Sequence, residues 1–70
     1  ASERGEHAEA LRCFESAVAS DPAFADAHFN LAVTLEAVGQ RERAREHWQT
    51  YLALEPSGEW AEVARRHLGR

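Results

Sequence analysis

The side chains that could support nucleophilic or metal chemistry are few in this sequence and form no motif. A nucleophile or base could come from four His, one Cys and four Ser residues, namely His7, His28, His47, His67, Cys13, Ser2, Ser16, Ser20 and Ser57. No pair among them falls within a recognisable catalytic motif. The His residues include no i, i+4 pair and no Cys partner at zinc-like spacing. The sequence therefore favours a protein that is not an enzyme and that has no cofactor or metal site.

Packing explains two of these residues better than chemistry does. We expect His28 to be a partly buried spacer between helices, and the other three His residues to lie at helix surfaces. Cys13 has only Arg12 as a basic neighbour in sequence, so we expect a half-buried and unreactive thiol. A single cysteine also excludes an internal disulfide and weakly favours a reducing compartment.

The charge pattern argues against nucleic acid and membrane partners. The net charge is −4, and the basic side chains, all of which are Arg, are interleaved with Glu where they are densest, at residues 41–46. Such interleaving is typical of a solvated, salt-bridged helix face rather than of a phosphate-binding surface. No apolar run approaches the roughly 20 residues that span a bilayer. Since the chain begins at Ala1, lacks Met and shows no leader, we expect a fragment of a longer, cytoplasmic protein.

Secondary-structure elements must position these residues, and Pro and Gly residues mark the ends of those elements at a fixed interval. Pro22 and Pro56 end two apolar segments and lie 34 residues apart, as do Gly5 and Gly39. Gly39 follows an apolar helical pattern as a left-handed helix stop would. The same 34-residue shift superposes Ala10 on Ala44, Phe14 on Trp48, Val18 on Leu52, Ala19 on Ala53 and Asp21 on Glu55. The chain therefore contains an internal repeat.

Apolar residues recur at helical spacing between these stops, with no sustained alternation of the kind that strands show. The pattern predicts four helices, near residues 6–20, 24–38, 40–54 and 58–68. The stripes that should face a core are Ala10, Leu11, Phe14, Ala17 and Val18; His28, Leu31, Ala32 and Leu35; Ala44, Trp48, Tyr51 and Leu52; and Trp60, Ala61, Ala64 and Leu68. Because the connections are short, successive helices should pack as antiparallel neighbours in an all-α fold.

A 34-residue period built as helix, turn and helix, with a closing proline, resembles the tetratricopeptide repeat. The residues that carry the resemblance are Ala10, Phe14, Pro22, Leu31, Ala32, Leu35, Gly39, Ala44, Trp48 and Pro56. Three positions depart from the family pattern. His28 stands where the family usually has a large aromatic residue, Tyr51 stands where the preceding repeat has Ala17, and Arg65 stands where a following hairpin would want a small residue. We expect Tyr51 to be accommodated by Ala61 and Ala64 of the last helix.

The resemblance implies antiparallel helix hairpins stacked as a short right-handed superhelical solenoid of four helices. Residues 1–70 would form a single domain, the C-terminal one and a half repeats plus a cap. Within it, residues 1–22 would supply the second helix of a truncated repeat, residues 23–56 a complete repeat, and residues 57–70 a C-terminal capping helix. Stacked repeats cover one another's apolar faces, so the flank of the first helix should need a further partner.

A second face of the helix at residues 24–38 is the best candidate for function. It carries Asp26, Phe29, Asn30, Val33 and Glu36, which by the resemblance would form the wall of a groove that receives a partner protein or peptide. Phe29 and Val33 could instead pack against residues outside this chain. The principal hypothesis is thus a non-catalytic protein-interaction module or scaffold.

The alternative hypothesis is a homo-oligomer or structural domain of a larger regulatory protein or enzyme. It would pair through Leu11, Phe14 and Val18 of the first helix, the apolar residues that the truncated repeat would leave on an exposed flank.

Overall fold

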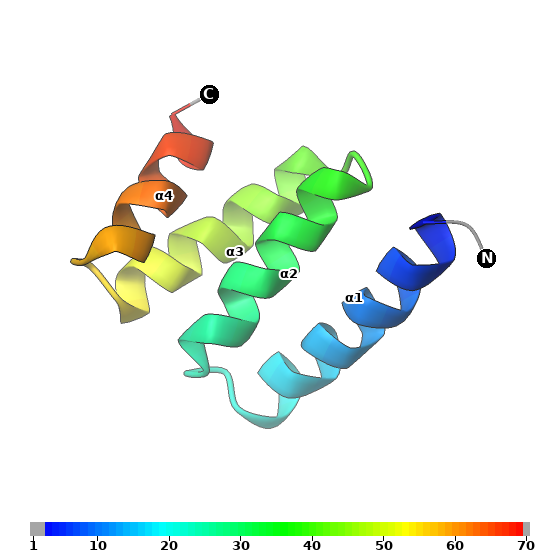
Figure 1. Ribbon diagram of the computed structural model, residues 1–70. Helices are drawn as coiled ribbons and strands as arrows, with labels where there is room; N and C mark the ends of the chain where they lie inside the picture. The colour runs from blue at the N-terminus through cyan, green and yellow to red at the C-terminus, as the bar shows by residue number, and fades with distance from the viewer. Residues whose placement is uncertain (1–2, 70) are drawn as a thin grey trace.

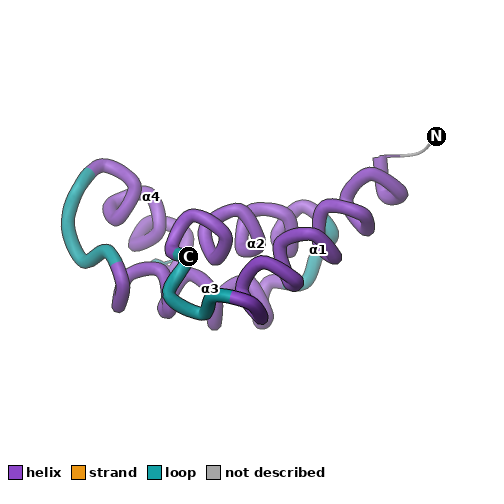
Figure 2. Tube along the Cα trace, turned by 90° about the horizontal axis from the view of Figure 1, so that it is seen from below, coloured by secondary structure: helices purple, strands orange, loops and turns teal. Residues whose placement is uncertain are grey.

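Residues 3–69, which the computed structural model describes, form four helices and no strand. They are α1 (Glu3–Ser20), α2 (Ala25–Ala37), α3 (Arg41–Leu54) and α4 (Glu59–Leu68). Each helix runs antiparallel to the one before it (Figure 1). Seen from below, α1 and α4 lie at opposite ends of the molecule with α2 and α3 between them (Figure 2). The all-α fold class and the four helices are therefore as predicted.

Gly39 ends α2 in the way that the sequence predicts. Gly39 has a φ of 87°, in the left-handed region that side chains with a Cβ rarely adopt. Its N–H donates to the carbonyl of Glu36 at 3.1 Å, and the N–H of Gln40 donates to the carbonyl of Leu35 at 2.8 Å. These two bonds define a Schellman motif, which satisfies carbonyls left open at the helix end. The chain then reverses directly into α3.

The core lies between α2 and α3 and extends to α4. Leu31, Leu35 and Trp48 are its largest fully buried side chains. The small residues of the pattern, Ala32 and Ala44, are also buried and let the two helix backbones approach closely. The remaining buried residues are Ala27, His28, Thr34, Tyr51, Ala61 and Ala64. Tyr51 and Ala64 of α4 belong to the same cluster of buried residues.

The first helix is less enclosed than the others. Ala10 and Phe14 are half-buried, and no described side chain of α1 is fully buried. Leu11, Phe14 and Val18 pack against the core cluster. An ion pair of 2.6 Å between the exposed side chains of Glu15 and Arg43 also connects α1 to α3.

Two expectations about burial are wrong. Cys13, expected to be half-buried, is exposed on α1. Trp60, which helical spacing assigned to the core-facing stripe of the last helix, is 61% exposed. The helix docks through Ala61 and Ala64, whose small side chains bring it close to α3, and this leaves the bulky indole at the edge of the contact. Pro22 and Pro56 are exposed in the two interhelical turns where they were predicted.

Candidate partner-binding pocket

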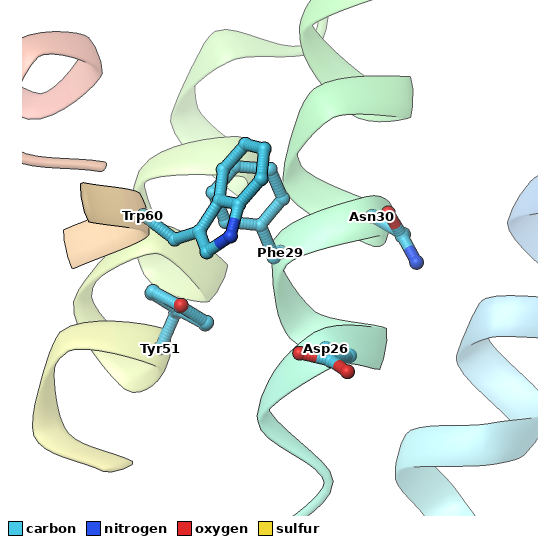
Figure 3. A pocket seen from close by; sticks show the side chains of 5 residues that line it. All are labelled: Asp26, Phe29, Asn30, Tyr51 and Trp60. Carbon is cyan, nitrogen blue, oxygen red and sulfur yellow. The ribbon is translucent and has the colours of Figure 1, made fainter. Parts of the chain in front are cut away.

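A recess of about 310 Å³ opens on one face of the molecule where three helices meet. Its lining residues are Asp26, Phe29 and Asn30 from α2, Tyr51 from α3 and Trp60 from α4. Figure 3 shows the rings of Trp60, Phe29 and Tyr51 gathered on one side, with the Asp26 and Asn30 side chains on the other. The recess is therefore aromatic at one end and polar at the other.

Phe29 is the centre of the aromatic wall. Its ring centroid lies 4.9 Å from that of Trp48, 5.1 Å from that of Tyr51 and 5.4 Å from that of Trp60. All three contacts are edge-to-face, the geometry that the quadrupoles of aromatic rings favour. Phe29 packs on the fully buried Trp48, while part of its own ring remains accessible. The wall is thus formed before any ligand binds.

The polar end of the recess carries negative charge. Asp26 and Asn30 are both exposed, and none of the basic residues that the structure describes lines the recess. The pKa of Tyr51 is raised from its usual value of 10.0, first by burial and then by the negative charges of Glu55 and Asp26. The carboxylates of Glu55 and Asp26 therefore both favour the neutral form of the Tyr51 phenol.

Three of the five residues expected to form a groove, Asp26, Phe29 and Asn30, line this recess together. Val33 lies on the same helix, is 44% exposed and stands outside the lining. Tyr51 and Trp60 were not among the expected groove residues. The sequence held a signal for Tyr51, an aromatic residue in a place where the preceding repeat has Ala17. No comparable signal marked Trp60, which its spacing assigned to the core.

Glu36, the remaining expected groove residue, bonds to neighbouring side chains. Its carboxylate accepts a hydrogen bond of 2.7 Å from Nε1 of the buried Trp48 and pairs with Nδ1 of His67 at 2.8 Å. The ring of His67 also stacks on that of Trp48 with a centroid distance of 4.5 Å. This cluster joins α2, α3 and α4, and it holds in place the helix that carries Trp60.

A second polar cluster lies at the beginning of α2, where the two Nδ1 atoms of His28 and His47 are 3.0 Å apart. Nε2 of His28 donates to the carbonyl of Pro22 at 2.9 Å, so His28 must accept at Nδ1 while it is neutral. The proton between the rings therefore belongs to His47. Burial, followed by the neighbouring His28 and Arg43, lowers the pKa of His47 below its usual 6.5. This pair ties the Pro22 turn to α2 and α3, in the spacer role expected of His28.

Within the part of the chain that the structure describes, no three His, Cys, Asp or Glu side chains are grouped so that they could hold a metal ion. None of the four described helices combines the length and apolar character needed to cross a bilayer.

The antiparallel hairpins, the 34-residue period and the close-packed Ala positions define a helical-repeat protein. A comparison with family models matches the tetratricopeptide repeat over residues 1–66, so the chain belongs to the tetratricopeptide repeat family. Comparisons with curated proteins and with solved structures found no match. Tetratricopeptide repeats generally mediate protein–protein interactions, and they are typically non-catalytic interaction modules.

Proposed function

We propose that this chain is a protein-interaction module that binds an extended segment of a partner protein in the recess between α2, α3 and α4. The observation that carries the proposal is the position of Trp60, which is 61% exposed yet lies with its indole against Phe29 at the wall of a preformed recess. Exposed aromatic residues beside a concave apolar surface are typical of binding sites.

The lining suits a peptide backbone and a side chain at once. Asn30 is exposed, and its amide can both donate to and accept from the main chain of a peptide. Trp60 and Phe29 offer large contact areas with few rotatable bonds, so little conformational entropy is lost on binding. Exposed Val33, one turn after Phe29, would extend the apolar contact along α2.

The alternative of self-association receives less support. It depends on Leu11, Phe14 and Val18 as an exposed apolar face of the first helix, and these three side chains are half-buried and pack against the core cluster. The described residues therefore offer a better reason for binding at the recess than for pairing through α1.

The test is a selection of random displayed peptides against the wild-type chain and against Trp60→Ala. Selected peptides are then titrated into the isotopically labelled chain, and amide and indole signals are followed by nuclear magnetic resonance. We expect peptides that shift the signals of Trp60 and Asn30 and that bind Trp60→Ala at least about tenfold more weakly, as is typical when a hot-spot aromatic residue is removed.

Phe24→Ala provides the matched control, because Phe24 is also a large exposed aromatic residue, at 45%, but does not line the recess. It should leave peptide affinity unchanged. If selection yields no binding peptide, or if the peptides bind Trp60→Ala as tightly as wild type, the proposed function is wrong.

A further inference from the structure

We infer that the recess formed by Asp26, Phe29, Asn30, Tyr51 and Trp60 takes a positively charged side chain, Lys or Arg, from the partner segment. This inference rests on the proposed function and adds to it the chemistry of the residue that the site selects. It follows from the aromatic wall, the charge and the size of the recess.

The aromatic wall offers ring faces in more than one orientation. The plane of the Phe29 ring makes an angle of 80° with that of Trp60 and 69° with that of Tyr51. Phe29, Tyr51 and Trp60 come from three different helices and approach the same space (Figure 3). A cation placed over an aromatic face within about 6 Å of its centroid is attracted by the ring quadrupole, most strongly for Trp. The aliphatic stem of Lys or Arg would meanwhile cover apolar ring surface.

The charge of the recess selects a cation over a neutral or acidic side chain. Asp26 lines the recess, and within residues 5–69 no Arg or His side chain does so. The carboxylates of Glu55 and Asp26 both raise the pKa of Tyr51, so both lie close enough to add negative potential at that ring. An ammonium or guanidinium group could pair with the carboxylate of Asp26, which a neutral apolar side chain could not do.

Among the described residues, four basic side chains line other recesses, namely Arg41, Arg43, Arg45 and His67. Arg41 and Arg43 line a separate recess near the start of α3, and Arg43 is paired with Glu15. The net charge of −4 also favours the approach of a basic segment from solution.

The volume of the recess fits one long side chain. At about 310 Å³ it stands at the lower end of the range for ligand pockets, roughly 300 to 1,000 Å³. A basic side chain from an extended peptide could enter it while the peptide backbone passes along Asn30.

The first experiment uses blocked pentapeptides of the form acetyl-Gly-Ser-Xaa-Ser-Gly-amide, titrated into the labelled full chain. Xaa is Lys or Arg in the test peptides and norleucine or citrulline in their uncharged counterparts, which keep the length of the side chain. We expect the charged peptides to shift the Trp60 indole signal and to bind about fivefold more tightly than the uncharged ones.

Two substitutions separate the contributions of the carboxylate and the ring. Asp26→Asn keeps the shape of the side chain and removes its charge, so the preference for Lys over norleucine should fall to within about twofold. Trp60→Leu keeps an apolar side chain without a ring face and should reduce Lys binding more than norleucine binding. The matched control is Glu9→Gln, which removes an exposed carboxylate from α1 and should leave the preference intact.

Asp26 and Trp60 are both exposed, and circular dichroism checks that each variant remains folded. The inference is wrong if norleucine binds as tightly as Lys, or if the Lys and Arg peptides leave the Trp60 signal unmoved at 20 mM, the highest concentration of the titration.

The peptides obtained by display selection distinguish failure of the cationic inference from failure of the proposed function. Peptides that bind the recess through an uncharged anchor would overturn the cationic inference and leave the proposed function standing. The absence of any recess-binding peptide would overturn both.

Discussion

At the scale of single residues, Glu36 is the acceptor for the indole N–H of a fully buried Trp48, at 2.7 Å. Glu36→Ala would leave that donor without its partner and would also release Nδ1 of His67. An unsatisfied buried donor costs about 1 to 3 kcal/mol, and we expect a loss of about 2 kcal/mol in the free energy of unfolding. Urea denaturation, monitored by circular dichroism, measures this loss of stability.

Two matched variants give this prediction its control. Glu36→Gln keeps an acceptor oxygen and should cost clearly less than Glu36→Ala. Glu9→Ala removes an exposed carboxylate on α1 and should change stability by no more than about 0.5 kcal/mol. Equal losses for Ala and Gln at position 36 would show that the hydrogen bond to Trp48 contributes little.

The contact between His28 and His47 leads us to expect that the stability of the fold changes with pH. The folded state lowers the pKa of His47 from 6.5, chiefly by burial, so the unfolded chain binds a proton more readily there. The contribution of His47 is therefore fully present above pH 6.5 and is lost progressively as the pH falls below it. Protonation of both rings would also bring two N–H groups together across the 3.0 Å separation of their Nδ1 atoms. We expect the free energy of unfolding to decline from pH 7 to pH 5.5.

The source of that decline is tested by comparison of variants, because other groups also titrate in this range. His47→Gln keeps a donor for Nδ1 of His28 but does not ionise, so it should flatten the pH dependence of stability measured by urea denaturation. His7→Gln, on α1 and away from the pair, should leave it as in wild type. If the His47→Gln chain loses stability as steeply as wild type, the pair does not govern the response.

At the scale of elements, the turn between α2 and α3 depends on Gly39. A Cβ at this position would meet no heavy atom within 4 Å, so any cost of Gly39→Ala comes from the backbone φ of 87°. The left-handed conformation costs a residue with a Cβ about 1 to 2 kcal/mol, and we expect destabilisation of that order in thermal or urea unfolding. Gly5→Ala, within α1, should be neutral or stabilising because alanine favours a helix. A neutral Gly39→Ala would mean that the turn relaxes to another conformation.

The positions of the four helices could be predicted because the signals that set them are local. The turn residues at Pro22, Gly39 and Pro56 and the apolar spacing between them depend only on neighbours in sequence. Burial at the margins of a helix depends on neighbours in space. Trp60 and Ala61 are adjacent and both apolar, but the closeness of the contact between α3 and α4 buries one and exposes the other.

At the scale of the whole molecule, the recess could be predicted only in part because its lining residues come from three helices. Asp26, Phe29 and Asn30 share one face of one helix, and helical spacing alone brings them together. Tyr51 and Trp60 join them only when α3 and α4 are docked, which the cluster of Glu36, Trp48 and His67 helps to fix. The side chains that complete the recess therefore depend on tertiary packing that no local pattern encodes.

Because the recess is built from three helices, occupation should stabilise the molecule as a unit. A ligand that binds the folded chain alone, at ten times its dissociation constant, raises the free energy of unfolding by about 1.4 kcal/mol. We expect this increase with a recess-binding peptide, together with slower hydrogen exchange in both α2 and α4. Under the same conditions Trp60→Ala should show neither change. Slower exchange confined to α2 would contradict a site that α4 completes, since the peptide would then be held by Asp26, Phe29 and Asn30 without Trp60.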